Sequence, residues 1–333
     1  MLEHYEGTEK LLEVWFRPIS SGDIKRQKSD LRDIPKTEWI SVLNIVKCEI
    51  VGEMEDENQH AYILSESSMF VSTYRFILKT CGTTLLLEAL DDLFQLAKKY
   101  CHFEVEDIFY SRKNFLRPDL QSTPYKDFQR EVEQLDKLFD CGAAYVLGRM
   151  NGDCWYLYTL DRNNVVQQPD QTLEILMTEL DPSVMKLFQD TGTKDGKDVT
   201  KESGIADILP EAKIHEKLFE PCGYSMNGLL PNNGYMTIHV TPEEEYSYVS
   251  FESNVEMDNY SDLVQKVIQT FNPGKFVMTL FANSFAKCGS SFSALKETFL
   301  NDYRRQDRQY SQFKCYDLTF GHYVQERMDT AKK

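Results

Sequence analysis

The segment Leu64–Phe70 places two adjacent serines behind a glutamate, between residues typical of β-strands. A serine hydroxyl can attack the preceding backbone carbonyl and convert that amide into an ester. If the ester then eliminates, Ser67 becomes a pyruvoyl group, a ketone at a new N-terminus that can accept electrons. These residues therefore permit self-cleavage between Glu66 and Ser67. Taken alone, paired serines between strands are more typical of a solvated turn.

A wider pattern favours the chemical interpretation. Together with Phe76–Thr84, the segment resembles the processing region of eukaryotic S-adenosylmethionine decarboxylase proenzymes. The resemblance implies pyruvoyl-dependent decarboxylation of S-adenosylmethionine to S-adenosylmethioninamine, the aminopropyl donor for spermidine and spermine. It also implies one domain, 1–333, cut into a β chain (1–66) and an α chain (67–333). The similarity continues in one order through Glu6–Phe16, Phe109–Phe115, Gly148–Asp161, Gln168–Pro182, Pro221–Gly228, Thr237–Glu252 and Pro273–Phe281.

Decarboxylation of an amino acid needs an electrophile that holds the released electrons. Pyridoxal phosphate would require a phosphate-binding loop, and the glycine-bounded segment 228–234 has no Lys-Ser/Thr after it. The eight cysteines include no Cys-x-x-Cys pair, which argues against a zinc site. We therefore expect a covalent pyruvoyl group made from Ser67 to form the Schiff base with substrate, without pyridoxal phosphate or metal.

The resemblance assigns roles to residues that would otherwise be unremarkable. Cys81 matches the proton donor to the substrate carbon, although a cysteine at a strand end is usually inert. Ser225 and His239 match the pair that assists processing, with His239 taking the Ser67 α-proton, although a lone histidine in a strand is usually structural. Glu6 and Glu9 complete the predicted catalytic set.

Substrate residues follow from the same comparison. Tyr5 and Phe219 match the aromatic residues that stack on adenine, and an aromatic face also attracts a sulfonium cation. Relatives carry Phe where this chain has Tyr5, which keeps the ring. Glu243 matches the carboxylate that binds the ribose hydroxyls, and Leu64 and Glu66 match backbone contacts.

Buried acidic residues in strands are costly unless a cation neutralises them. In the family the corresponding cluster binds putrescine, which stimulates processing and decarboxylation, and we expect the same activator here. The predicted effector set consists of Glu13, Lys79, Phe109, Ser111, Arg112, Asp170, Thr172, Glu174, Glu252, Phe281 and Tyr316.

The elements that must position these residues are mostly strands. Residues 10–16 and the apolar runs on either side of Asn151-Gly152 and Asn232-Asn233-Gly234 predict strands and hairpins. Helical periodicity predicts helices over 84–100 and 260–271, begun by Thr83 or Thr84 and by Ser261, with shorter candidates at 39–46 and 172–180. Strands, helix and strand recur in this order twice. We therefore expect an α+β fold of two similar halves. The resemblance implies a four-layer αββα sandwich of two antiparallel sheets.

Composition limits the remaining possibilities. Among 333 residues, 41% are hydrophobic and the net charge is −16, which disfavours nucleic acid as a partner. No apolar run is long enough for a membrane span, and the acidic N-terminus lacks a signal-peptide pattern. We expect a cytoplasmic enzyme, with a homodimer suggested by the family.

Two alternatives stay open at this stage. A catalytically inactive paralogue could activate a partner by heterodimerisation, but this chain retains Glu66, Ser67, Cys81, Ser225 and His239 together. A self-processing amidohydrolase would instead keep the Ser67 hydroxyl after cleavage.

Overall fold

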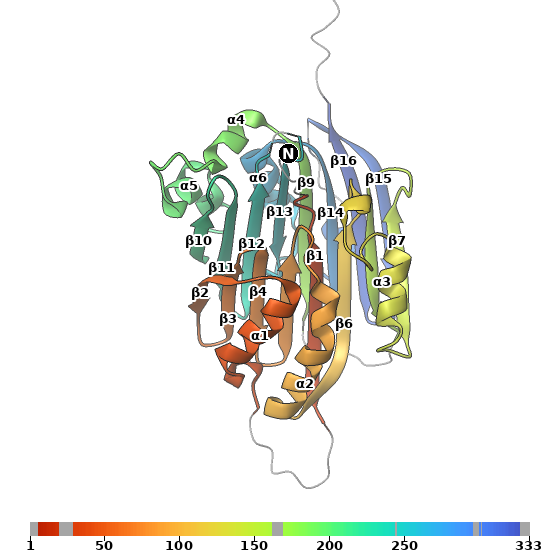
Figure 1. Ribbon diagram of the computed structural model, residues 1–333. Helices are drawn as coiled ribbons and strands as arrows, with labels where there is room; N and C mark the ends of the chain where they lie inside the picture. Colours follow the sequence, from red (N-terminus) through yellow and green to blue (C-terminus); the bar gives the residue numbers. More distant parts are fainter. Residues whose placement is uncertain are drawn as a thin grey trace, which may run out of the picture. The chain divides into compact units, whose positions relative to one another are not determined.

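Figure 1 shows the computed structural model of the chain. Backbone contacts divide the chain into two compact units: 1–146 with 155–164 and 231–233, and 147–154 with 165–230 and 234–333. The structure describes residues 6–19, 29–161, 169–243, 245–295, 300 and 302–326.

The first unit is built on an eight-stranded sheet in the order β2-β3-β4-β5-β1-β6-β8-β7, whose paired strands run antiparallel. Helices α1 and α2 lie across one face of it (Figure 1). The strands are β1 (Lys10–Pro18), β2 (Ile50–Glu55), β3 (Gln59–Leu64), β4 (Ser67–Ser72), β5 (Arg75–Thr80), β6 (Phe103–Lys113), β7 (Gly142–Gly148) and β8 (Cys154–Leu160). The helices are α1 (Lys36–Val46), α2 (Leu90–Cys101) and α3 (Phe128–Leu135), with 3-10 turns η1 (Leu31–Asp33), η2 (Leu86–Ala89) and η3 (Pro118–Leu120).

The second unit has a sheet in the order β10-β11-β12-β13-β9-β14-β16-β15. Its strands are β9 (Gln171–Leu180), β10 (Lys213–Leu218), β11 (Tyr224–Leu230), β12 (Gly234–Thr241), β13 (Tyr248–Ser253), β14 (Pro273–Asn283), β15 (Tyr303–Gln312) and β16 (Tyr316–Gln325). Its helices are α4 (Pro182–Met185), α5 (Gly196–Glu202), α6 (Ser261–Phe271) and α7 (Ser291–Ala294), with 3-10 turns η4 (Lys186–Phe188) and η5 (Ile205–Asp207).

The two sheets have the same strand order: adding eight to each strand number of the first unit gives the order found in the second unit. The prediction of an α+β fold with two similar halves is therefore confirmed. Each unit supplies one antiparallel sheet layer and one layer of helices. The Asn232-Asn233 hairpin is also confirmed: both residues have positive φ, 59° and 60°, as a tight turn between antiparallel strands requires.

Alternation along the strands gives each sheet two different faces. In β1, Leu12, Val14 and Phe16 belong to the apolar core shared with α1 and α2. Glu13 projects from the opposite face and is also buried. The apolar face of each sheet thus packs on helices, whereas the other face carries the polar residues whose chemistry matters.

One helix prediction is wrong, because residues 172–180 lie in strand β9. Leu173, Ile175 and Met177 alternate into the apolar core of the second unit, and β9 pairs with both β13 and β14. The spacing of the apolar residues fits both a helix and a strand, so pairing with the neighbouring strands decides that this segment is a strand. The expected caps also differ: Leu85 and Tyr260 occupy the N-cap positions of η2 and α6.

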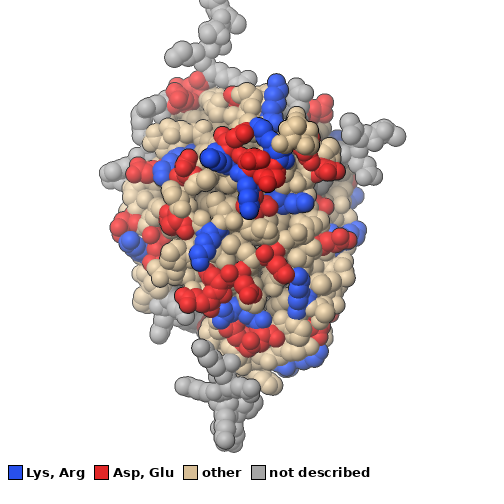
Figure 2. Space-filling view, turned by 90° about the vertical axis from the view of Figure 1, so that its left-hand side faces the viewer, with Lys and Arg blue, Asp and Glu red and all other residues tan. Residues whose placement is uncertain are grey.

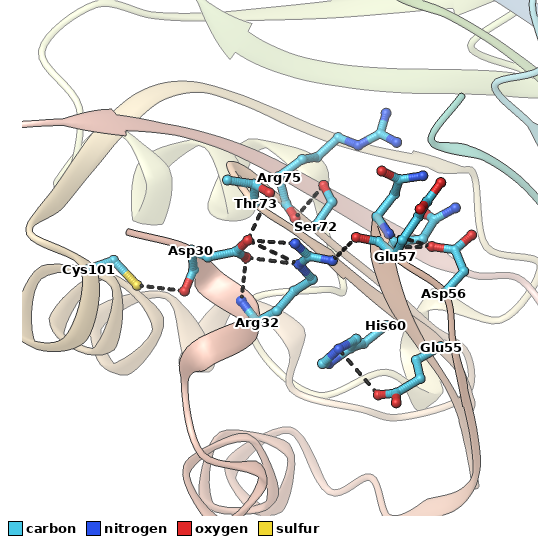
Figure 3. A network of polar contacts seen from close by, with 12 residues as sticks. Asp30, Arg32, Glu55, Asp56, Glu57, His60, Ser72, Thr73, Arg75 and Cys101 are labelled. Atoms are coloured by element: carbon cyan, nitrogen blue, oxygen red, sulfur yellow. Dashed lines mark hydrogen bonds and ion pairs between the residues drawn. The ribbon is translucent and has the colours of Figure 1, made fainter. Parts of the chain in front are cut away.

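A polar network anchors the segment before α1 (Figure 3). The Asp30 carboxylate accepts hydrogen bonds from the Arg32 guanidinium and from the Thr73 hydroxyl, and Arg32 also donates to the Glu57 carbonyl at 2.5 Å. Burial opposes the charged form of Asp30, but the bonds from Arg32 outweigh it and lower the pKa of Asp30. The network ties η1 to the β2–β3 and β4–β5 turns.

Charged side chains on the face drawn in Figure 2 are intermingled, with acidic residues next to basic ones. None of the described helices is both long and apolar enough to span a membrane.

Candidate active site

The predicted scissile bond lies in the turn that joins β3 to β4. Leu64 and Ser67 are register partners across this hairpin, and Ser65 and Glu66 form the turn. Ser67 is buried and has φ of 126°, a backbone conformation that residues with a Cβ rarely adopt. Such conformations cost about 1–3 kcal/mol and are found where the surrounding structure enforces them. Backbone strain is thus located at the junction that the sequence predicts to break.

The Ser67 hydroxyl has a carboxylate as its hydrogen-bond partner. It donates to Glu9 Oε1 at 2.5 Å, and both residues are buried. Lys79 Nζ lies 3.5 Å from Glu9 Oε2 and supplies the countercharge. Glu9 is therefore placed to accept the proton that Ser67 must lose before it becomes a nucleophile.

The Glu66 carbonyl faces Cys81. Its oxygen accepts a hydrogen bond from the Cys81 backbone N–H at 3.1 Å, and Cys81 Sγ lies 3.5 Å away. The same Sγ lies 3.6 Å from the Glu66 carboxylate. Donors aimed at a carbonyl oxygen stabilise the negative charge that develops there during nucleophilic attack. Cys81 thus contacts the group that Ser67 would attack.

Glu6 is used differently from Glu9. Its carboxylate accepts hydrogen bonds from the backbone amides of Leu116 at 2.5 Å and Arg117 at 3.2 Å. Its own carbonyl accepts the Gly82 N–H at 3.2 Å. In this arrangement Glu6 connects the turn after Cys81 with the loop after β6, so the structure gives it a supporting position.

Ser225 and His239 meet in the second unit. They are register partners on β11 and β12, and His239 Nδ1 lies 2.8 Å from Ser225 Oγ. His239 Nε2 lies 2.9 Å from Thr237 Oγ1. The Thr237 hydroxyl has carbonyl acceptors on Met226 and Asn227 at 3.1 Å and 3.0 Å.

These contacts determine the histidine tautomer. Because Thr237 donates its one proton to a carbonyl, its oxygen accepts from His239 Nε2–H. Nδ1 then keeps its lone pair and accepts from the Ser225 hydroxyl. In this tautomer Nδ1 is the basic atom of His239.

Two predicted substrate residues also lie in the second unit. Phe219 is half-buried at the start of a turn closed by its N–H donating to the Gly223 carbonyl at 2.9 Å. Burial, with the charge of Glu243 added, raises the pKa of Cys222 in that turn, which places Glu243 beside it. Burial also raises the pKa of Glu243. Among the described residues, Glu243 Oε2 is buried without a hydrogen-bond partner. Such an oxygen suits a ligand hydroxyl.

Most of the predicted effector residues gather within each unit. Glu174 and Glu252 are buried register partners on β9 and β13, and Glu252 accepts from the Tyr235 hydroxyl at 2.6 Å. The Tyr316 hydroxyl donates to Asp170 at 3.0 Å. Thr172 pairs with Phe281, whose ring stacks on Tyr316 at 4.5 Å.

In the first unit, Glu13 pairs with Phe109, and Leu11 pairs with both Lys79 and Ser111.

Arg112 occupies a different environment from the rest of that set. It binds Glu131 of α3, with Nη2 2.5 Å from Oε1, and both side chains are buried. The rings of Phe115 and Tyr156 lie 4.5 Å and 4.8 Å from its guanidinium carbon. Because strand residues alternate, Arg112 faces the helices whereas Ser111 faces the opposite side of the sheet.

Sequence reasoning missed three side chains that complete these sites: Lys10, Glu131 and Thr237. Thr237 was recognisable, because a residue two positions before His239 in a strand shares its face. The contacts of Lys10 and Glu131 depend on distant segments and had no local signal.

Among the predicted residues, Leu64 and Glu66 lie in or next to the scissile turn, and Tyr5 lies outside the described residues. The described part of the chain holds no group of His, Cys, Asp or Glu suited to a metal ion.

Comparison with known proteins gives a consistent result. A family model for adenosylmethionine decarboxylase matches residues 2–324. Curated proteins named S-adenosylmethionine decarboxylase proenzyme include one from Xenopus laevis, 52% identical over 95% of this chain and 94% of its own length. Another, from Drosophila melanogaster, is 46% identical over 96% and 95%. The crystal structure of a Trypanosoma brucei AdoMetDC-delta26 monomer matches with a TM-score of 0.62 and 25% identity, covering 78% of this chain and 99% of that one.

Proposed function

The chain belongs to the adenosylmethionine decarboxylase family of carboxy-lyases, and on that premise we propose that it cleaves itself between Glu66 and Ser67 and decarboxylates S-adenosylmethionine with the resulting pyruvoyl group. One arrangement carries the proposal. A buried, backbone-strained serine donates to a carboxylate while the preceding carbonyl accepts from Cys81. This geometry favours an active proenzyme over an inactive paralogue.

Cleavage begins with Glu9 accepting the Ser67 hydroxyl proton. Ser67 Oγ bonds to the Glu66 carbonyl carbon, and the Cys81 N–H stabilises the oxyanion. The bond to the Ser67 nitrogen then breaks as that nitrogen takes up the proton held by Glu9. The chain is then joined by an ester. His239 Nδ1 removes the Ser67 α-proton, the Cβ–Oγ bond breaks, and Glu66 leaves with a C-terminal carboxylate. Water replaces the remaining nitrogen, which departs as ammonia, and residue 67 becomes a ketone.

The pyruvoyl group supplies an electrophile that captures the substrate amine and holds the electrons left when CO₂ departs. The chain's own residues bind and protonate. Phe219, with Tyr5, offers an aromatic face to the adenine and the sulfonium. The buried Glu243 oxygen accepts from the ribose hydroxyls, and backbone groups of Leu64 and Glu66 complete the contacts. Cys81, whose sulfur lies beside residue 66, returns a proton to the substrate carbon.

Putrescine is the proposed activator. Glu174 and Glu252 are buried register partners on neighbouring strands, and like charges placed opposite each other destabilise a sheet unless a cation compensates them. A diamine dication would neutralise this set together with Asp170 of the same unit. The Lys79–Glu9 ion pair links the effector set to the Ser67 hydroxyl within the first unit.

The chain is also proposed to form a homodimer and to be cytoplasmic. β7 and β15 end their sheets, and the edge of a sheet can pair with a second copy of the chain, which supports a homodimer. The described cysteines form no disulfide with one another, which supports a cytoplasmic enzyme.

Intact mass and carbonyl labelling test the central proposal. The purified protein should yield fragments 1–66 and 67–333, the larger one blocked at its N-terminus and reactive with a hydrazine. Ser67→Ala should stay full length, and the neighbouring Ser68→Ala serves as the matched control that still cleaves. A single unlabelled polypeptide would overturn the proposal and favour the inactive paralogue. Cleavage that leaves a free serine amine would instead indicate an amidohydrolase.

The effector proposal has its own test. Cleavage and decarboxylation rates should rise with putrescine but not with the monocation butylamine at equal concentration. Asp170→Asn should weaken that response. Equal rates with and without putrescine would remove this part of the proposal and leave self-cleavage intact.

A further inference from the structure

Lys10 is a buried cation that the reaction described above does not use. It lies on the helix-facing side of β1 with Leu12, and its side chain is fully buried. Nζ donates to the Gly82 carbonyl at 3.0 Å and lies over the rings of Tyr125 and Phe115, 4.8 Å and 5.4 Å from their centroids. A buried ammonium is costly unless such partners compensate it.

The Gly82 carbonyl belongs to the turn that carries Cys81. Gly82 has φ of 60°, and its N–H donates to the Glu6 carbonyl at 3.2 Å. Thr84 Oγ1 donates to the Cys81 carbonyl at 2.9 Å, and the Cys81 N–H donates to Glu66. Every backbone polar group of Cys81 and Gly82 therefore has a partner. Two of the four partners come from one short stretch of chain: Glu6 lies just before β1, and Lys10 is the first residue of that strand.

Lys10 and Cys81 also interact through their charges. Burial lowers the pKa of Lys10 to about 8, while a charged Cys81 raises it. Coupling between two sites is reciprocal, so the Lys10 ammonium favours the Cys81 thiolate to the same extent. The opposing group at Cys81 is the Glu66 carboxylate, 3.6 Å from Sγ.

The other charged or titratable groups near Lys10 are accounted for. Glu131 raises the pKa of Lys10 and Arg112 lowers it, and these two residues form a 2.5 Å ion pair with each other. Cys48 is neutral at physiological pH, because burial raises its pKa to about 12. Tyr125 contributes its ring, and burial raises the pKa of its hydroxyl well above its ordinary value.

We propose that Lys10 is a positioning residue for Cys81: it fixes the Gly82 carbonyl and its ammonium stabilises the thiolate that remains after Cys81 gives up its proton. The inference rests on the proposed function of Cys81 as proton donor. The donated proton goes to the substrate carbon, and the negative charge left on sulfur lies within the field of Lys10. Stabilising that charge lowers the barrier to donation.

The test measures the rate at which iodoacetamide alkylates Cys81, by mass spectrometry of its peptide, from about pH 6 to about pH 10, a range that brackets the Lys10 and thiol titrations. Lys10→Met keeps the volume and removes the charge. It should slow alkylation at pH 7 about tenfold, because the thiolate loses the stabilisation that the ammonium provides. The difference in alkylation rate between the unsubstituted protein and Lys10→Met should narrow above pH 8, where Lys10 itself loses its proton. Lys10→Arg should restore much of the rate.

Arg75→Met is the matched control. It removes another buried cation from the same sheet, one that lies 5.2 Å from the Trp15 ring and pairs with Glu13 at the far end of the β1–β5 ladder. Its Cys81 profile should match that of the unsubstituted protein. A Lys10→Met profile that is unchanged, or faster at every pH because the turn has loosened, would overturn the inference. An equal slowing of Cys81 alkylation by Arg75→Met would also overturn the inference. Alkylation does not require cleavage, so an uncleaved chain would refute the proposed function without deciding this one.

Discussion

Ser67 donates a 2.5 Å hydrogen bond to Glu9, a residue 58 positions earlier in the chain. The pairing of β5 with its two neighbours explains the contact. Thr80 at the end of β5 is the register partner of Ser67 on β4 and of Lys10 on β1. The strand ends are thereby aligned, and Glu9, one residue before β1, reaches the hydroxyl. The nucleophile thus comes from β4 and the candidate base from the residue before β1, two strands that are separated by β5 in the sheet.

Replacing Glu9 by glutamine tests that relationship. Glu9→Gln keeps the shape but removes the proton acceptor, so self-cleavage should slow by about 10²-fold or more. The measurement is the fraction of full-length chain over time on a denaturing gel. Glu104→Gln, which removes an exposed carboxylate paired with Arg17, should cleave normally. Normal cleavage of Glu9→Gln would show that another group takes the proton.

Thr237→Val tests the orientation of His239. Without the hydroxyl, Nε2 loses its hydrogen-bond partner, and the tautomer with a basic Nδ1 is no longer selected. Cleavage should slow about tenfold, less than the roughly 10²–10⁴-fold that loss of an acid–base group itself would cost.

His239→Ala provides the reference for that variant. It should stop at uncleaved amide or at the ester, and hydroxylamine distinguishes them because it cuts the ester. Normal cleavage of His239→Ala would remove its proposed role. Wild-type kinetics for Thr237→Val would mean that Ser225 alone orients the ring.

The Arg112–Glu131 pair should be structurally important. Glu131→Gln leaves the buried guanidinium without its countercharge, and the free energy of unfolding should fall by about 3–5 kcal/mol. Urea denaturation of a processing-blocked Ser67→Ala background measures this without interference from cleavage. The double variant Arg112→Met with Glu131→Leu should recover much of the loss, because no unpaired charge remains. A double variant as unstable as the single one would indicate that packing dominates.

Lys10 should make stability depend on pH in the alkaline range. Its pKa is lowered from 10.5 to about 8 on folding, so between these values the unfolded chain binds more protons than the folded one. The free energy of unfolding therefore rises with pH across this window, by at most about 3 kcal/mol, and the cost of the buried charge is fully present below pH 8.

Lys10→Met lacks this titration and gives the necessary comparison. The difference in unfolding free energy between the Ser67→Ala background and the same background with Lys10→Met should change between pH 7 and pH 10, since all other groups cancel. A constant difference would mean that Lys10 titrates near its ordinary pKa in the folded state.

Local sequence predicted what depends on neighbouring residues. The two hairpins, the helix positions near α1, α2 and α6, and the repeated order of elements follow from turn residues and apolar spacing. Residues 172–180 show the limit of this reasoning. Their apolar pattern fits a helix as well as a strand, and only pairing with β13 and β14 makes them β9.

The sequence by itself identified the candidate reactive groups: Ser67, Cys81, Ser225 and His239 were predicted from their motifs. Only the tertiary structure decided how the groups beside them are used. It joins Glu9 to Ser67, commits Arg112 to Glu131 on the helix face, and directs Lys10 to the Gly82 carbonyl. The physical reason is that a residue's type sets its possible chemistry, whereas its partner, burial and charge depend on strands that are distant in sequence and adjacent in the sheet.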